Sequence, residues 1–272
     1  MLRGPGRPTE DGSIEWDLDL DAGRHSYLAH HLVNGHPTMP GTFLLAAAAE
    51  AAQTLHPGQP VTAVRDASFD VFVRPTNDRA RYTLRARDTS TPQEQRVTAE
   101  VYFTAHIVLG LHRAVAAPLD PADPEPQADP LLPDLYYFPT APVYLSGPFV
   151  NTRRWRSTPD GPAALWKPPS DAFRLHPVLR RLPLPALLLC AVLRARTLET
   201  PPDGTRQVVV PRHIACIDLR STRGNDHQLT LDHPKGITTR YHRNDGSYSA
   251  TAPDGNVLLR ITGFEGTRLG RV

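Results

Sequence analysis

The chain has 272 residues, 40% of them hydrophobic, and its 30 basic and 28 acidic side chains leave a formal net charge of +2. The chain does not have the large basic excess of nucleic-acid binders, so we expect no nucleic-acid partner. The N-terminal segment has no apolar core of the signal-peptide kind, and the longest apolar run, 182–193, is too short to span a bilayer. We therefore expect no membrane contact and a cytoplasmic location, which two reduced cysteines, Cys190 and Cys216, also fit.

The first forty residues lead from a polar segment to a compact motif. Residues 1–12 are polar and rich in glycine and proline, which predicts disorder. Residues 14–20 alternate apolar and polar side chains, as a half-exposed strand does. The stretch 31–40 then reads His-x-x-x-Gly-x-x-x-x-Pro. Its glycine permits a tight turn or a close backbone approach to a ligand, and its proline is suited to the start of a helix.

Residues 41–55 contain no proline and are mostly alanine and leucine, so they predict a buried helix. The N-terminus of such a helix offers free N–H groups and a positive dipole to an oxygen that gains charge. His31, just before it, can transfer a proton near neutral pH. This combination of a histidine loop and a helix N-terminus predicts a site.

The rest of the chain repeats the layout of strands around one helix. Residues 118–134 are rich in proline and acidic side chains, which predicts a stiff linker. An apolar helix is expected at 185–197, and hairpin turns at 244–246 and 253–255. Strands are expected at 62–74, 80–88 and 95–109 before the linker, and at 149–157, 161–167, 206–221, 226–232, 237–243, 246–253 and 256–269 after it.

The motif from His31 to Pro40 resembles the first active-site motif of the dehydratase domains of polyketide synthases, members of the hot-dog superfamily. The segment Gly147-Pro-Phe149 is similar to the start of their second half, and 252–264 to their closing hairpin. The resemblance implies an α+β double hot-dog fold, with two long central helices that are each wrapped by a curved antiparallel sheet. It divides the chain into a hot-dog half at 1–117, the linker at 118–134 and a second half at 135–272.

The resemblance also implies an activity. Such domains act on a β-hydroxyacyl or enoyl thioester that a carrier protein delivers on a phosphopantetheine arm, so we expect no other cofactor. An acyl carrier protein or a polyketide synthase assembly is the implied partner, and a homodimer is left open. His31 is implied as the general base, and the residues implied in substrate binding are Gly35, Pro40, Gly41, Gly147, Leu189 and Leu193. No metal site is expected, because the histidines lack zinc-binding spacing.

The second active-site motif of the family carries an acidic residue, and this chain departs from that pattern. If the motif starts at Pro185, the acid position is Leu189 and the next polar position is Leu193. If it starts at His176, the acid position is Arg181. A positioned general acid contributes about 10²–10⁴-fold to a reaction that expels hydroxide. Asp171 and His176 are the candidates for a substitute acid.

A histidine without a partner acid can still shift a double bond, because that reaction expels no water. The alternatives to a dehydratase are therefore an enoyl isomerase and a non-catalytic protein that binds acyl chains or shapes an assembly. Apolar side chains at Leu189 and Leu193 fit either alternative. The run of arginines at 153–156 either docks an acidic carrier or forms a solvated strand edge.

Overall fold

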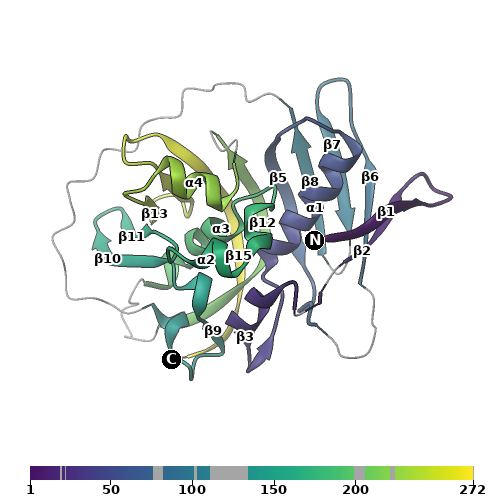
Figure 1. The fold of residues 1–272 in the computed structure, drawn as a ribbon. Coiled ribbons are helices and arrows are strands. Elements are labelled where there is room, and N and C mark those ends of the chain that lie inside the picture. The colour runs from purple at the N-terminus through teal and green to yellow at the C-terminus, as the bar shows by residue number, and fades with distance from the viewer. Residues whose placement is uncertain are drawn as a thin grey trace.

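The structure is a computed structural model, and it describes residues 1–18, 20–21, 23–75, 82–100, 103–110, 134–198, 206–220 and 224–271. Most of its strands form one sheet that curves around two helices, and three short strands form a second sheet (Figure 1). The strands are β1(Leu2–Pro8), β2(Ile14–Leu18), β3(His31–Val33), β4(His36–Pro37), β5(Val61–Phe69), β6(Thr83–Asp88), β7(Gln95–Glu100), β8(Phe103–Leu109), β9(Val143–Leu145), β10(Thr152–Thr158), β11(Gly161–Trp166), β12(Gln207–Leu219), β13(Ile237–Tyr241), β14(Tyr248–Thr251) and β15(Val257–Arg271). The α-helices are α1(Gly41–Leu55), α2(Ala172–Leu175), α3(Ala186–Arg194) and α4(Asp226–Asp232), and the 3₁₀ segments are η1(Ser26–His30), η2(Leu135–Tyr137), η3(Gly147–Phe149), η4(Pro177–Arg180) and η5(Ala195–Leu198).

The main sheet joins two halves of the chain at one strand pair. Its order is β1-β2-β6-β7-β8-β5 in the first half, followed by β12-β15-β14-β13-β11-β10 in the second. The seam is the antiparallel pair β5–β12, in which Ala67 lies opposite Ile214. The strands of the two halves therefore lie side by side in one continuous sheet.

Helix α1 packs against the concave side of the curved sheet in the first half. It begins and ends at the predicted residues, and it contacts β5, β6, β7 and β8. A run of alanines on this helix is fully buried, and small side chains allow the strands to approach it closely. Helix α3 has the same place in the second half, where it contacts β13 and β14, and it also packs against α1. Both central helices of the expected fold are therefore present.

The small sheet links the site motif of the first half to the second half. Its order is β4-β3-β9, and its pairs place His31 opposite Leu145 and Val33 opposite Val143. The strand that carries His31 therefore completes its hydrogen bonding with residues that come more than a hundred positions later.

Residues 226–232 were expected to be a strand, and that prediction is wrong because they form helix α4. The side chain of Asn225 caps this helix by accepting the backbone N–H of Gln228 at 3.1 Å. Leu229 is buried while Leu231 is 61% exposed. The alternation that suggested a strand is therefore one turn of an amphipathic helix.

Two further predictions about the first half need correction. The segment 95–109 is two paired strands, β7 and β8, and its buried residues lie on both of them. The N-terminal segment was expected to be disordered, but β1 pairs with β2. Gly6 allows that pairing, because a Cβ there would lie 2.3 Å from the Ile14 side chain and under 3 Å from Trp16.

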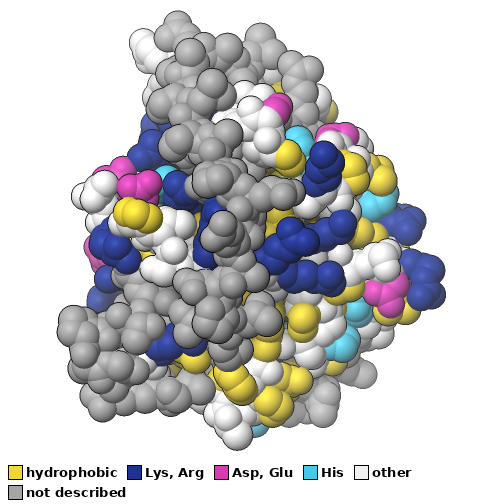
Figure 2. Space-filling view, turned by 90° about the vertical axis from the view of Figure 1, so that its left-hand side faces the viewer, with side chains coloured by type: hydrophobic (Ala, Val, Ile, Leu, Met, Phe, Trp, Pro, Cys, Tyr) yellow, Lys and Arg dark blue, Asp and Glu magenta, His cyan; other side chains and the backbone are white. Residues whose placement is uncertain are grey.

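The predicted linker lies outside the described residues except at its last position. Asp134 is 1% exposed and is part of the interior of the second half. The arginines at 153–156 lie on β10, which is the last strand of the sheet and therefore a sheet edge. Figure 2 shows Lys and Arg side chains gathered on the face that carries β10 and β11. In the described segments, no helix combines the length and the apolar character that a membrane crossing requires.

Candidate active site

The motif around His31 is a tight hairpin. Asn34 and Gly35 both have positive φ, 50° and 76°, which is the geometry of a type I′ turn between β3 and β4. Gly35 is exposed, and a Cβ added to it would meet nothing within 4 Å. Gly35 therefore serves the turn, and it lies in the wall of neither cavity described below.

The hairpin fixes both the position and the tautomer of His31. The backbone N–H of Thr38 donates to the His31 carbonyl at 3.0 Å, and the His31 ring returns a bond from Nδ1 to the Thr38 carbonyl at 2.8 Å. A carbonyl oxygen only accepts, so Nδ1 carries the proton of the neutral ring. The lone pair then lies on Nε2, which is the atom able to act as a base.

The surroundings of His31 keep its ring uncharged. Burial lowers its pKa to about 4, and the positive charge of Arg194 acts in the same direction, against the bond to Thr38. The ring of Phe149 lies 5.4 Å away, centroid to centroid. At neutral pH the histidine is therefore ready to accept a proton.

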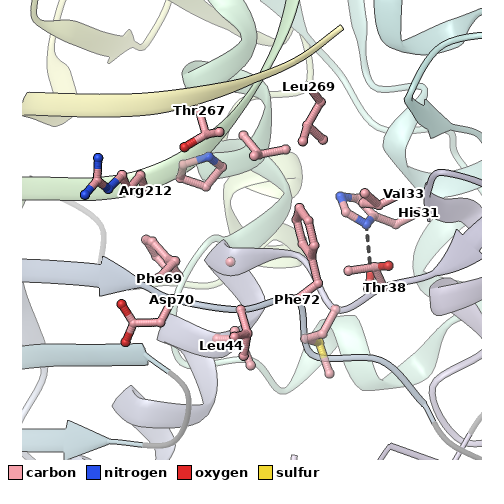
Figure 3. A pocket seen from close by; sticks show the side chains of 15 residues that line it. His31, Val33, Thr38, Leu44, Phe69, Asp70, Phe72, Arg212, Thr267 and Leu269 are labelled. Carbon is pink, nitrogen blue, oxygen red and sulfur yellow. Dashed lines mark hydrogen bonds between the residues drawn. The ribbon is translucent and has the colours of Figure 1, made fainter.

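Two adjoining cavities have His31 in their walls. The larger, of about 220 Å³, also has exposed residues such as Phe72 and Arg212 in its wall, and we call it the outer cavity. The smaller, of about 60 Å³, is lined by buried and half-buried residues, and we call it the inner cavity. Figure 3 shows the side chains around the outer cavity, with the dashed bond from His31 to Thr38. Gly41 lines both cavities, so the start of α1 lies where they meet.

The first turn of α1 presents unpaired donors to the inner cavity. Pro40 precedes the helix and has no capping side chain, while its carbonyl accepts from Phe43 and Leu44. The N–H groups of Gly41 and Thr42 have no acceptor among the described residues. The Thr42 hydroxyl is also buried without a partner there. Pro40, Gly41 and Thr42 all line the inner cavity, so three donors are available to an oxygen that gains charge.

Helix α3 faces the inner cavity with Cys190, Leu193 and Arg194, which lie on one helical face at the spacings i, i+3 and i+4. Leu189 is fully buried and lies in the wall of neither cavity. Cys190, and not the expected Leu189, therefore lies in this wall. Leu193 is in the cavity wall, as predicted for a substrate-binding residue.

Arg194 is buried and its donors are engaged inside the protein. Its Nη1 lies 2.6 Å from a carboxylate oxygen of Asp134, its Nη2 donates to Asn151 at 2.8 Å, and its Nε donates to the Cys190 carbonyl at 3.3 Å. The guanidinium also lies over the ring of Tyr137. Arg194 therefore helps to form the inner wall, but its guanidinium keeps its proton near neutral pH and does not act as an acid.

Gly147, expected in substrate binding, lies outside both cavities. It has a φ of 51°, and a Cβ there would lie 2.7 Å from the His30 ring. Glycine is required at this position for the turn that carries Phe149 to the ring of His31. Its contribution is therefore to position Phe149.

The two candidates for a substitute acid also lie elsewhere. Asp171 precedes α2 at the surface, 4.0 Å from Arg174. His176 is bound through Nδ1 to the Ser26 hydroxyl at 2.8 Å, and its ring packs edge-on against His30. Burial lowers the pKa of His176, which keeps it neutral. Neither residue is in the wall of a cavity that contains His31.

Sequence reasoning missed Thr42, Cys190 and Arg194. Thr42 lies in the first turn of a correctly predicted helix, and this position at the helix N-terminus could have identified it as a candidate site residue. Cys190 and Arg194 lay in an apolar stretch that also contains Arg196, so no single side chain marked the face that points inward. Within the described ranges, no group of three His, Cys, Asp or Glu side chains could hold a metal ion.

The first half of the chain matches a known protein family. Residues 5–104 match the family model described as the polyketide synthase dehydratase domain. A search of curated protein sequences finds no match. The matched residues include His31, Pro40, Gly41 and Thr42, so the family match covers the histidine hairpin and the N-terminus of α1.

Solved structures extend the likeness to the second half. The chain is similar to the dehydratase domain from the CurF module of curacin polyketide synthase, with a TM-score of 0.75 and 14% identity over 98% of each chain. It is also similar to the dehydratase domain of PpsC from Mycobacterium tuberculosis, solved in complex with C12:1-CoA, with a TM-score of 0.69 and 21% identity over 98% of each chain. Residues 5–104 thus match the polyketide synthase dehydratase family, and the chain as a whole has the double hot-dog fold of such dehydratase domains.

Proposed function

We propose that this protein moves a proton on an unsaturated acyl thioester, shifting its carbon–carbon double bond, with His31 as the base. The observation that carries the proposal is the pairing of a neutral His31, with Nε2 free, with an inner cavity that has unpaired donors but no carboxylate in its wall. Such a site can stabilise an enolate and can return a proton to carbon.

The reaction follows from these groups. Nε2 of His31 takes a proton from the γ-carbon of an α,β-unsaturated thioester, and the electrons move through the double bond to the thioester oxygen. The N–H groups of Gly41 and Thr42 and the Thr42 hydroxyl donate to that oxygen. The imidazolium then returns the proton to the α-carbon, which leaves the double bond between the β- and γ-carbons and restores neutral His31.

Loss of water is the less favoured reaction, because a departing hydroxide needs an acid beside His31. In the walls of the two cavities the only carboxylate is Asp70, which is exposed at the end of β5. In Figure 3 its carboxylate points away from His31. A bound β-hydroxyacyl group would therefore lie near the base His31, but no carboxylic acid would be positioned to protonate its hydroxyl group.

We also propose that the substrate arrives on the phosphopantetheine arm of an acyl carrier protein within a polyketide synthase assembly. The outer cavity supports this, since it is mostly apolar and opens beside exposed Val71, Phe72 and Arg212. The PpsC domain with the same fold was solved with C12:1-CoA, an acyl thioester on a similar arm.

The test is mass spectrometry in D₂O with two pantetheine thioesters, an α,β-unsaturated octenoyl group and a β-hydroxyoctanoyl group. We expect deuterium to enter the octenoyl group and its double bond to move, with no water lost from the other substrate. His31→Ala should abolish both changes. His36→Ala, which replaces an exposed histidine outside both cavities, is the matched control and should behave as the unchanged protein.

His31-dependent loss of water would instead identify a dehydratase. Binding of octanoyl-pantetheine with no change in either substrate would identify a non-catalytic acyl-binding protein. Each of these two results overturns the proposed isomerase.

A further inference from the structure

We propose that Cys190 is the residue that decides which reaction this cavity performs, because its thiol lies in the wall of the same cavity as His31, where an acid would protonate a departing hydroxyl group. The inference rests on the proposed function, in that it uses the same cavity and the same base. It adds a residue of helix α3 that sequence reasoning had not considered as part of the site.

The first support is the direction of Cys190. It lies in the middle of α3, a helix whose other residues from Ala186 to Val192 are fully buried, yet Cys190 itself is only partly buried. It lies in the wall of the inner cavity together with His31. The cavity therefore provides the open space that Cys190 faces.

The second support is the unpaired hydroxyl of Thr42, which lines the same cavity. Thr42 is 3% exposed, and its Oγ1 has no hydrogen-bond partner among the described residues. A buried hydroxyl without a partner costs about 1–3 kcal/mol, so its place in a cavity wall indicates a polar ligand that satisfies it. A thioester oxygen can accept the hydrogen bond that this hydroxyl does not make within the described residues.

The third support comes from the other proton carriers in the inner wall, because each of them is engaged. The hydroxyl of Tyr136 donates to the Val209 carbonyl at 2.6 Å, and burial raises its pKa. Arg194 is held by Asp134 and Asn151. Among the hydroxyl and thiol groups of this wall, those of Thr42 and Cys190 make no hydrogen bond within the described part of the chain.

A buried thiol differs from a carboxylic acid in the reaction it supports. Burial raises the pKa of Cys190, so the thiol stays protonated and gives up its proton poorly to a leaving hydroxide. A carboxyl group at 190 would lie one helical turn from Arg194, within the same wall. Such a group would protonate the β-hydroxyl as the Cβ–O bond breaks, while His31 takes the α-proton and the freed electron pair forms the double bond. Water leaves, and exchange with solvent restores the carboxyl proton and the neutral imidazole.

The experiment replaces Cys190 and measures water loss from β-hydroxyoctanoyl-pantetheine by mass spectrometry. We expect Cys190→Asp to raise the rate of water loss by about 10²-fold or more over the unchanged protein, the usual contribution of a positioned general acid. Cys190→Asn, which has nearly the same shape but no acidic proton, is the matched control and should give no gain. Adding His31→Ala to Cys190→Asp should remove the gain.

A Cys190→Asp protein that melts normally and still binds octanoyl-pantetheine, but loses no more water than Cys190→Asn, would overturn the inference. This outcome is distinct from failure of the proposed function, which is read from deuterium uptake by the unchanged protein. Either result can occur without the other.

A second measurement on the unchanged chain covers the case in which Cys190→Asp does not fold. We expect octanoyl-pantetheine to slow the alkylation of Cys190 by iodoacetamide at least tenfold, as read from peptide masses. Cys216 on β12, outside both cavities, is the internal control and should be alkylated at an unchanged rate. Equal rates at Cys190 with and without the thioester would contradict its place beside the ligand.

Discussion

Asp134 and Arg194 form an ion pair of 2.6 Å in which neither side chain is more than 4% exposed. Removal of one partner from such a pair leaves a buried charge uncompensated, which costs about 3–5 kcal/mol of stability. We expect Asp134→Asn to lose that much in urea denaturation. The double variant Asp134→Leu with Arg194→Met should recover most of the loss, because no charge then remains. A loss below about 1 kcal/mol in Asp134→Asn would show that the guanidinium finds other partners.

The pH dependence of the proposed reaction should reveal the environment of His31. Its pKa of about 4 lies well below the ordinary 6.5, so the base form persists as the pH falls through 6 and 5. We expect kcat/KM for the isomerisation to stay level down to about pH 5 and to decline toward pH 4. A profile that declines near pH 6.5 would contradict a buried, neutral imidazole.

Thr42 offers a test in which stability and activity should separate. Thr42→Val keeps the shape of the side chain but removes the unpaired hydroxyl, so the free energy of unfolding should stay level or rise. Loss of one donor to a developing oxyanion should lower kcat by about 10²-fold. Thr42→Ser retains the hydroxyl and should keep most of the activity. A fall of stability in Thr42→Val would show that the hydroxyl has a structural partner.

Asp226 caps helix α3 from another element. Its carboxylate accepts the N–H groups of Leu187 and Leu188 at 2.8 and 2.9 Å, where Pro185 offers no cap of its own. Burial nevertheless raises its pKa to about 7 from an ordinary 3.8, so between these values the folded protein binds more protons than the unfolded chain. Stability from this group is therefore full below pH 3.8 and is lost as the pH rises through 7.

The variant Asp226→Asn isolates that contribution. We expect the free energy of unfolding of the unchanged protein to fall relative to that of Asp226→Asn between pH 5 and pH 8. Urea denaturation at several pH values measures the difference. A constant difference across this range would mean that the carboxylate is ionised throughout.

Arg212 should recognise the carrier arm. It is exposed in the wall of the outer cavity and makes no hydrogen bond or ion pair within the described residues. A guanidinium there can bind a phosphodiester, and its loss should raise KM about tenfold. We expect Arg212→Gln to raise KM for a carrier-bound substrate but to leave KM for a pantetheine thioester, which lacks the phosphate, unchanged. Arg174→Gln, at an exposed arginine on α2, should change neither value.

The sequence was most informative where one local rule dominated. Pro40 and an unbroken apolar run determined the bounds of α1, and the match is complete at both ends. The sequence was less informative where alternation alone was used. Residues 226–232 form a helix whose N-cap is Asn225, a signal directly before it that the apolar–polar pattern does not contain. β1 is ordered because Gly6 fits against Trp16, a partner that comes later in the chain and is not visible in such a pattern.

The candidate site shows the same division. The hairpin of His31 and the start of α1 could be predicted, since each depends on neighbours in the chain. The wall that α3 contributes to the inner cavity could not be predicted. This helix is almost entirely apolar, so its periodicity does not define which residue points inward. The structure resolves this ambiguity in favour of Cys190 over Leu189. A shift of one residue along a helix turns a side chain by about 100°, which separates a cavity wall from the core.

The pairing of β3 with β9 has a consequence for how the protein can be divided. The family match covers 5–104, which includes His31, but the strand beside His31 and the Phe149 ring both come from the other half. A fragment that ends before residue 111 would keep His31 and lose the neighbours that hold it. It would also expose β5 as a bare edge open to pairing with other chains. The surroundings of His31 are thus formed by both halves together, and neither half provides them alone.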